Sequence, residues 1–244
     1  MLTKAQVKFI KSLQEKKYRK LEQCFLVEGE KSVLELLQSD FEVKFIVGTD
    51  AFLSTYSDQL DNRICIEANE KDLSALGEFR SNEAALAVVK MKHATVSDLK
   101  PAKLQLVLDN IQDPGNLGTI IRTADWYGIQ QIVVSEDTVD CYNPKVIAST
   151  KGSFTRVEIV YTDIKNWLLQ QNQHSIYGAL LGGENVRHTE FDENAILIIG
   201  NEAHGIRPEI LPLIHKKITI PKYGKAESLN AAIATAILLD RMVS

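Results

Sequence analysis

The sequence predicts an α/β protein of two domains, in which a small α/β domain precedes a larger domain with a parallel β-sheet. Short apolar runs alternate with helix-like patterns along the chain, which is typical of α/β folds. Near Pro101 the chain becomes polar, so we expect the domain boundary near residue 100. The 244 residues, of which 45% are hydrophobic, are enough to bury a core in each domain. We therefore divide the chain into residues 1–100 and 101–244.

The N-terminal domain is expected to contain short strands connected by helices. Apolar residues at helical spacing, with Thr3 and Gln6 as a capping pair, predict a short amphipathic helix within residues 1–20. Two further helices are expected, one near residues 30–38 and one that starts after Asn69. The expected strands cover residues 25–27, 43–47, 64–66 and 84–89.

The C-terminal domain is expected to form a sheet of parallel strands with helices on both sides. Its apolar runs are continuous rather than alternating, as in strands that are buried on both faces. One helix is expected over residues 119–126 with Gly128 as its stop, one at Pro144 after the N-cap Asn143, and a long Ala-rich one that ends at Met242. The expected strands cover residues 104–108, 131–134, 157–160, 176–181, 196–199 and 217–220.

Composition limits the class of protein. The chain has 28 basic and 32 acidic residues and a net charge of −4. No apolar run reaches the roughly 20 residues of a membrane span, and residues 1–20 lack the apolar segment of a secretory signal. We therefore expect a cytoplasmic protein that does not enter a membrane. The widely spaced Cys24, Cys65 and Cys141 form neither a disulfide framework nor a metal-ligand set, so we expect reduced thiols.

Positive charge is concentrated at the N-terminus, where Glu15 is the one acidic residue among the first twenty. The basic residues there are Lys4, Lys8, Lys11, Lys16, Lys17, Arg19 and Lys20. One interpretation is a face that neutralises nucleic-acid phosphates. The other is a solvated helix face, which is what charge alone favours.

Glycines and small polar residues crowd the ends of three expected strands, where ligands bind in open α/β sheets. These loops are residues 109–118, 200–205 and 221–230. Each combines glycine, which allows a ligand close to the backbone, with an amide, carboxyl or hydroxyl group that can orient it. Any one of these residues is explained by a turn or a helix cap, so the coincidence of three loops at one sheet edge is what indicates a site.

The common nucleotide and hydrolase motifs are absent from the sequence. It contains no G-x-x-x-x-G-K-[ST], no G-x-G-x-x-G and no G-x-S-x-G. This argues against a P-loop NTPase, a dinucleotide oxidoreductase and an α/β-hydrolase.

Three segments resemble, in order and spacing, the signature motifs of the SpoU/TrmH group of SPOUT RNA ribose methyltransferases: residues 110–126, 197–206 and 220–239. Residues 1–100, especially 25–29, resemble the small substrate-binding domain that precedes the catalytic domain in many members. The resemblance implies a C-terminal SPOUT domain with a deep trefoil knot, S-adenosylmethionine bound in the knot, and a homodimer that completes the site.

The resemblance also implies roles for individual residues. Those expected around the reacting centre are Asn116, Arg122, Glu202, Ser228 and Asn230. Those expected to hold the cofactor are Leu180, Gly182, Gly200, Asn201, Ile220 and Leu229. Ala203 departs from the family, which usually has glycine there, so we expect a modest change in the shape of its loop.

Methyl transfer to a ribose 2′-hydroxyl requires alignment of the reactants and loss of the hydroxyl proton. Arg122, whose guanidinium stays charged, would clamp a phosphate or stabilise the developing alkoxide; the family's arginine has also been assigned an activating role. Glu202 is the alternative proton acceptor, and Ser228 and Asn230 would orient groups through hydrogen bonds. We interpret His204 as a loop histidine. No histidines and cysteines have metal-ligand spacing, so we expect no metal.

These observations predict an S-adenosylmethionine-dependent RNA 2′-O-ribose methyltransferase. We expect ribosomal RNA rather than transfer RNA as the substrate, because a separate N-terminal domain is present. The alternatives are the same chemistry on transfer RNA, and a non-catalytic RNA-binding or assembly protein on the same fold. The intact set of motif residues argues against the second alternative.

Overall fold

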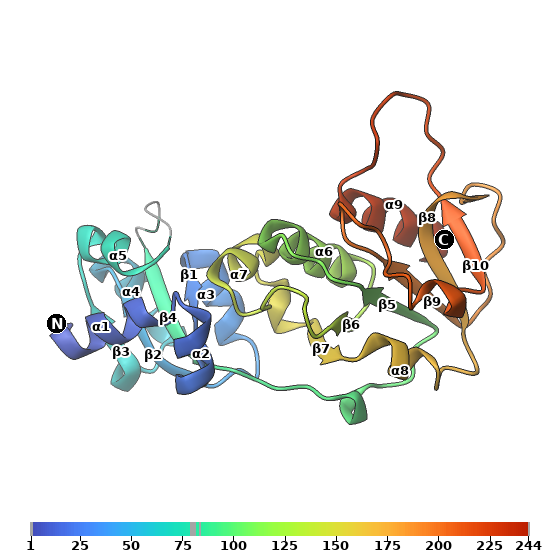
Figure 1. Ribbon diagram of the computed structural model, residues 1–244. Helices are drawn as coiled ribbons and strands as arrows, with labels where there is room; N and C mark the ends of the chain where they lie inside the picture. Colours follow the sequence, from blue (N-terminus) through green and yellow to red (C-terminus); the bar gives the residue numbers. More distant parts are fainter. Residues whose placement is uncertain (1, 79–81, 83, 244) are drawn as a thin grey trace. The chain divides into compact units, whose positions relative to one another are not determined.

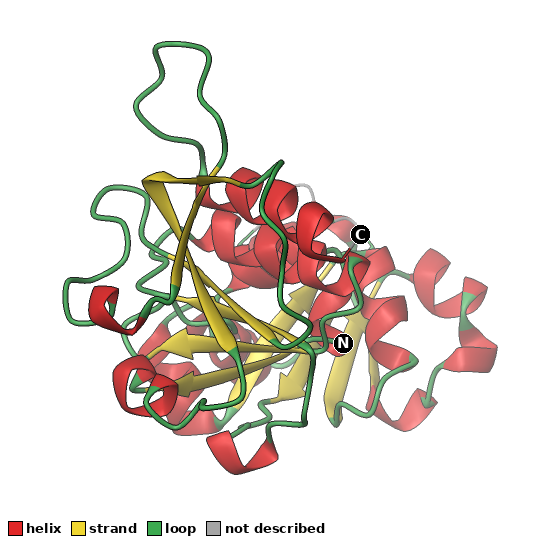
Figure 2. Cartoon of the chain, turned by 90° about the vertical axis from the view of Figure 1, so that its right-hand side faces the viewer, coloured by secondary structure: helices red, strands yellow, loops and turns green. Residues whose placement is uncertain are grey.

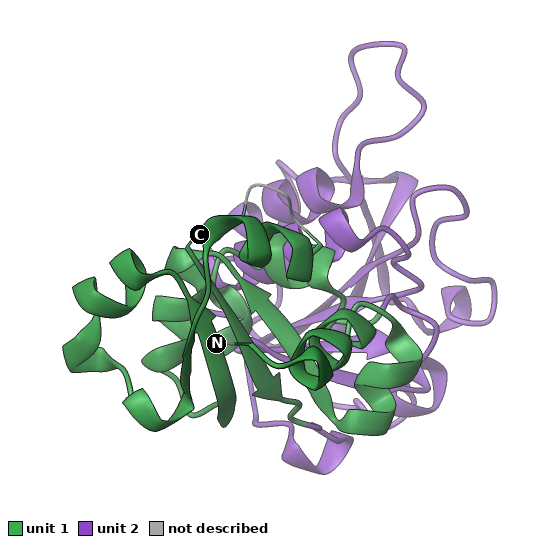
Figure 3. Ribbon diagram, turned by 90° about the vertical axis from the view of Figure 1, so that its left-hand side faces the viewer, with its two compact units in different colours: residues 1–92, 140–155 green, residues 93–139, 156–244 purple. Residues whose placement is uncertain are grey.

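The computed structural model describes residues 2–78, 82 and 84–243 and divides into two units (Figures 1 and 3). Unit 1 contains residues 1–92 and 140–155, and unit 2 contains residues 93–139 and 156–244. The chain thus returns to unit 1 after it has begun unit 2. Polarity along the sequence does not reveal this return, because residues 140–155 carry no domain-boundary signal of their own.

Unit 1 contains a four-stranded sheet in the order β1-β4-β2-β3. Strand β4 is antiparallel to both neighbours, and β3 is parallel to β2. The strands are β1 (Cys24–Glu28), β2 (Val43–Gly48), β3 (Cys65–Glu67) and β4 (Ala85–Lys90). All four expected strands are confirmed, with ends that differ by one or two residues.

Three helices of unit 1 begin at polar caps that the sequence indicates. Thr3 and Gln6 form the expected capping box of the first helix, Asn69 caps α5, and Asn143 caps α7. The helices are α1 (Lys4–Ser12), α2 (Lys16–Glu22), α3 (Glu30–Leu37), α4 (Asp50–Thr55), α5 (Glu70–Leu76) and α7 (Pro144–Thr150). Sequence analysis missed α2 and α4, because six or seven residues are too few for a helical period to be recognised.

Segment 140–155 completes a core of unit 1. Ile147 and Phe154 are buried in one cluster with Phe25, and the rings of Phe25 and Phe154 lie edge to face with centroids 6.0 Å apart. Helix α7 also packs against β1. This burial explains why the segment belongs to unit 1.

Unit 2 contains a six-stranded sheet in the order β10-β8-β9-β5-β6-β7, and every neighbouring pair is parallel. The expected parallel sheet is therefore confirmed. All five residues of β9 are buried, which accounts for its continuous apolar run. The strands are β5 (Leu104–Leu108), β6 (Gln131–Ser135), β7 (Glu158–Thr162), β8 (Ser175–Asn185), β9 (Ala195–Ile199) and β10 (Lys216–Thr219).

The helices of unit 2 are α6 (Pro114–Trp126), α8 (Ile164–Leu168) and α9 (Ala231–Val243). Helix α6 begins five residues before the expected start at residue 119, because Asp113 accepts the Asn116 N–H and Pro114 occupies the first helical position. Asn116 therefore lies in the first turn of α6 rather than in a loop. Helices α6 and α9 pack against each other.

Short 3₁₀ turns occur in both units. They are Ser57–Gln59, Asn62–Ile64 and Ser153–Thr155 in unit 1, and Val96–Asp98 and Leu211–Leu213 in unit 2.

The pairing of β8 with β10 is interrupted in the middle. Lys217 lies opposite Gly178, but the next residue, Ile218, lies opposite Glu184. Beyond β10 the chain makes a long excursion before it enters α9 (Figure 2). The trefoil knot implied by the family resemblance stays a prediction.

No helix in the described part of the chain has the length and apolar character that crossing a membrane would need. Among the same residues, no group of three or more His, Cys, Asp or Glu side chains is arranged to hold a metal ion. The cysteines Cys24, Cys65 and Cys141 are not joined in disulfide bonds.

Candidate active site

Three of the predicted reacting-centre residues are joined by hydrogen bonds. The Asn116 side chain uses Nδ2 to donate to Oε1 of Glu202. Its Oδ1 accepts from Nδ2 of Asn230 at 2.7 Å. One amide therefore links the first turn of α6, the loop after β9 and the residue before α9, all in unit 2.

Helix caps hold two members of this trio in place. The backbone N–H of Asn116 donates to Oδ1 of the N-cap Asp113 at 2.7 Å. Oδ1 of Asn230 accepts the N–H of Ala232 at 3.0 Å and so caps α9. Because that oxygen is engaged by the helix, the amide nitrogen of Asn230 is directed to Asn116.

The loop that carries Glu202 is closed by Asn201. The backbones of Asn201 and Gly205 exchange two hydrogen bonds, of 3.0 and 2.8 Å. The Asn201 side chain donates to the Asn110 carbonyl at 2.8 Å and accepts from the N–H groups of Ala203 and His204. Both the side chain and the backbone of Asn201 thus shape the loop.

An ion pair between Arg207 and a buried carboxylate forms a second anchor for this loop. Asp109, at the end of β5, is fully buried and accepts from the backbone N–H of Arg207 at 2.8 Å and from its Nε at 2.6 Å. Burial raises the pKa of Asp109, while Arg207 acts to lower it. Sequence analysis missed this pair. The sequence does show a carboxylate, Asp109, directly after an expected buried strand, but it does not show that Arg207 is its partner.

Gly200 is required by the loop itself. A Cβ atom there would lie 2.3 Å from the carbonyl carbon of Gly205 and 2.4 Å from the nitrogen of Ile206. We expected a ligand to lie close to Gly200, but the backbone of Gly205 and Ile206 lies against it instead. Ala203 is not among the residues with positive φ, so its methyl group adds no backbone strain.

Of the residues predicted to hold the cofactor, Leu180 and Gly182 lie on β8, Gly200 and Asn201 follow β9, Ile220 follows β10, and Leu229 lies just before α9; β10, β8 and β9 are neighbours in the sheet. Leu180 and Ile220 are half-buried, and Leu229 is 47% exposed. Gly182 has a φ of +76° and open space around it. Apolar side chains that keep exposed surface, next to backbone polar groups, fit an adenine ring and a methionine chain.

Arg122 and Ser228 are not joined to the trio. Both are exposed, on α6 and on the loop before α9 respectively. Among the described residues, neither side chain has a hydrogen-bond or ion-pair partner. A single copy of the chain therefore assembles part of the predicted site.

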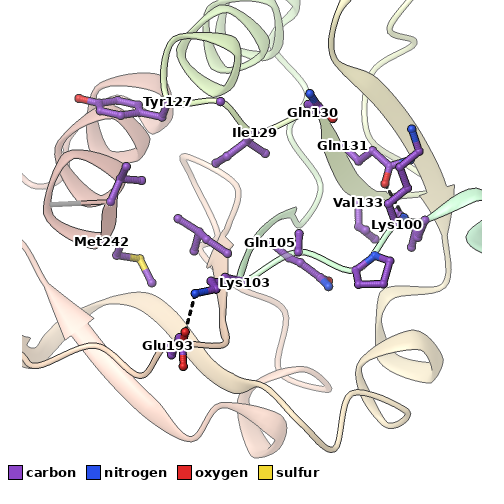
Figure 4. A pocket seen from close by; sticks show the side chains of 16 residues that line it. Lys100, Lys103, Gln105, Tyr127, Ile129, Gln130, Gln131, Val133, Glu193 and Met242 are labelled. Atoms are coloured by element: carbon purple, nitrogen blue, oxygen red, sulfur yellow. Dashed lines mark hydrogen bonds and ion pairs between the residues drawn. The ribbon is translucent and has the colours of Figure 1, made fainter.

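A hollow of about 440 Å³ in unit 2 lies away from these residues (Figure 4). It is lined by the starts of β5 and β6 and the end of α9, and Lys103 points to Glu193 across it. No predicted site residue lines this hollow. We therefore place the site by the side-chain network at the opposite ends of the strands.

Comparisons with known proteins agree with the family resemblance of the sequence. Residues 103–240 match the SpoU rRNA Methylase family, and residues 4–87 match the MRM3-like substrate binding domain. The chain belongs to the SpoU rRNA methylase family. This SpoU methylase is 35% identical over 237 residues to the 23S rRNA (guanosine(2553)-2′-O)-methyltransferase RlmP of Bacillus subtilis, covering 96% of this chain and 94% of RlmP.

Solved structures extend the likeness of this SpoU methylase to the whole chain. A TrmH-family protein from Porphyromonas gingivalis is 36% identical with a TM-score of 0.86, over 99% of this chain and 98% of that one. An rRNA methyltransferase from Sinorhizobium meliloti, solved with bound AdoMet, is 28% identical with a TM-score of 0.89, over 99% and 95%.

Proposed function

We propose that this SpoU methylase transfers a methyl group from S-adenosylmethionine to a ribose 2′-hydroxyl of ribosomal RNA. The observation that carries the proposal is the trio Asn116, Glu202 and Asn230, joined from three distant segments at the edge of a parallel sheet. The family, the AdoMet-bound relative and the rRNA-directed relative support it.

S-adenosylmethionine supplies an activated methyl group when it is bound. The residues that would hold it are the half-buried apolar Leu180 and Ile220 and the backbone near Gly200. Glu202 accepts a hydrogen bond from Asn116, which orients one carboxylate oxygen and leaves the other to take a proton or a hydrogen bond from the ribose. The positive Arg122 would stabilise the oxygen as it loses its proton.

Ribosomal RNA is favoured over transfer RNA because the rRNA-directed RlmP aligns with this chain over nearly the full length of both. With ribosomal RNA as its substrate, the protein would act in the cytoplasm, where ribosomes are found.

The test is methyl transfer by purified protein to a 23S rRNA fragment and, in a second arm, to transfer RNA. We expect one 2′-O-methylated nucleotide in the rRNA fragment, located by mass spectrometry. Replacing that nucleotide with its 2′-deoxy form should abolish transfer, because only ribose offers the acceptor oxygen. Methylation of a base, or of transfer RNA alone, would contradict the proposal.

We further propose that two copies complete the active site. Exposed apolar side chains lie on the packed helices α6 and α9: Trp126 is 84% exposed, Ile233 52% and Ile237 37%. Such apolar surface is typical of an interface. A second copy would cover these residues and could bring its own Arg122 to the trio.

A mixing experiment tests this arrangement. Arg122→Ala and Glu202→Gln chains, each inactive alone, are mixed and allowed to exchange subunits. If Arg122 acts across the dimer, heterodimers carry one intact site and about a quarter of all sites become active. If the mixture stays inactive, or sedimentation shows only monomers, the proposal is wrong.

A further inference from the structure

The first two helices of unit 1 carry six exposed lysines, which we call the α1–α2 lysine face: Lys4, Lys8, Lys11, Lys16, Lys17 and Lys20. The seventh basic residue of the segment, Arg19, does not belong to it, because only 1% of its surface is exposed. The structure therefore corrects the expectation that all seven basic residues form one surface.

The lysine face lacks the acidic partners that other lysines have. Among the described residues, none of its six ammonium groups forms an ion pair with a carboxylate. Elsewhere Lys90 pairs with Glu42, and Lys103 with Glu193. Acidic residues are in excess over the whole chain, so the absence of partners is local.

The arrangement of these lysines is unfavourable by itself. Lys4, Lys8 and Lys11 are spaced four and three residues apart, which places them on one side of α1. Like charges at this spacing repel and destabilise a helix by roughly 0.2–0.5 kcal/mol per pair. The first turn of α1 has no acidic residue to offset them. Such a surface is stabilised when it binds a polyanion, which replaces repulsion between lysines with attraction to phosphates.

The fold holds this face rigidly. Ile10 and Leu13, on the opposite side of the segment, are fully buried. The Arg19 guanidinium donates from Nη1 to the carbonyls of Leu13 at 2.9 Å and Gln14 at 2.8 Å. Its Nη2 lies 2.6 Å from Oδ2 of Asp140. The turn between α1 and α2 is thereby fixed, so the lysines are presented on a preformed surface.

We infer that the α1–α2 lysine face binds the phosphate backbone of the RNA substrate. The inference rests on the proposed function, which makes RNA the substrate, and adds where the chain holds it. Lysines spread over two helices suit a series of phosphates, and contacts to phosphates carry no sequence information. This face supplies affinity, and recognition of the target nucleotide belongs to other residues.

The experiment measures RNA binding by the full chain over a range of salt concentrations, with a labelled 23S rRNA fragment as the probe. The variant replaces Lys4, Lys8 and Lys11 with Gln, which retains helix propensity. We expect affinity at low salt to fall at least about tenfold. The slope of log affinity against log salt should decrease by about 0.7 to 0.9 for each phosphate that the variant no longer neutralises. Deletion of residues 1–20 is unsuitable, because it removes the buried Ile10, Leu13 and Arg19.

The matched control replaces Lys90, Lys103 and Lys165 with Gln and changes the net charge equally. These three lysines are also exposed. An unchanged slope in the α1 variant, or an equal loss in the control, would overturn the inference. Methyl transfer separates this failure from failure of the proposed function: the α1 variant should raise KM for RNA and leave kcat unchanged. If the unaltered protein methylates no RNA, the proposed function fails, and the salt dependence still reports on the lysine face.

Discussion

Asn116 shows how one side chain can organise a site whose parts are far apart in the sequence. Its amide donates to Glu202 and accepts from Asn230, so replacing either the oxygen or the nitrogen would disconnect one partner. The family resemblance implied all three residues, but the hydrogen bonds between them depend on strand order. The sequence also predicted Arg122, and the structure places it on α6 outside this network.

Arg122→Lys retains the charge but loses the planar fork that can contact two oxygens at once. We expect turnover to fall at least about tenfold, which corresponds to about 1.4 kcal/mol in the activation free energy. Binding of S-adenosylmethionine, measured by calorimetry, should change little, because Arg122 is not among the residues predicted to hold the cofactor. Near-normal turnover would mean that Arg122 has no part in the reaction.

Arg207→Met should destabilise the protein, because it removes the charged partner of the buried Asp109 carboxylate and leaves only the backbone N–H of residue 207. We expect the free energy of unfolding to fall by about 2–3 kcal/mol in urea titrations. The control is Arg63→Met, since Arg63 pairs with Asp61 at the surface, where its side chain is 89% exposed. Such exposed pairs contribute about 1 kcal/mol or less. Equal effects of the two substitutions would show that the Asp109 pair does not anchor the Glu202 loop.

At the scale of secondary-structure elements, β8 and β10 meet at the point where their pairing is interrupted. Gly183 lies against the β10 backbone there, and a Cβ atom would come within 2.6 Å of the carbonyl group of Lys217. Periodicity predicted both strands, but this close approach was not predictable, because residues 176–181 were expected as one short strand and not as an eleven-residue strand with an excursion.

Gly183→Ala should therefore force β8 and β10 apart. We expect a loss of about 1–3 kcal/mol in the free energy of unfolding, as for other overpacked sites. Gly224→Ala serves as the control, because a Cβ at Gly224 meets no atom within 4 Å. Its effect should stay within about 0.5 kcal/mol. If Gly183→Ala is equally mild, the two strands can adjust their separation at this point.

At the scale of the whole molecule, unit 1 is discontinuous in sequence. Residues 140–155 supply Ile147 and Phe154 to its core and Asp140 to the buried Arg19. A domain boundary drawn at residue 100 from polarity alone separates these residues from their partners. This predicts that the N-terminal half needs the segment to be stable.

A fragment of residues 1–92 should unfold at a lower temperature than the same fragment joined by a flexible linker to residues 140–155. The short fragment lacks two buried apolar side chains, and removal of one such side chain from a core commonly costs about 2–5 kcal/mol. Circular dichroism during heating measures the difference. Equal melting temperatures would show that the segment covers unit 1 without stabilising it.

The sequence by itself determined the alternation of strands and helices, the parallel sheet, the capping residues and the motifs of the SpoU family. These features follow from the local periodicity of apolar residues and from residue types at fixed spacing, both of which can be read directly from the sequence. Only the tertiary structure decided which basic residue is buried, which loop closes on itself at Gly200, and which segment returns to unit 1. Each of these depends on a partner far away in the sequence. Arg19 and Lys20 look alike as neighbours in the chain, but folding brings Asp140 to one of them and leaves the other exposed.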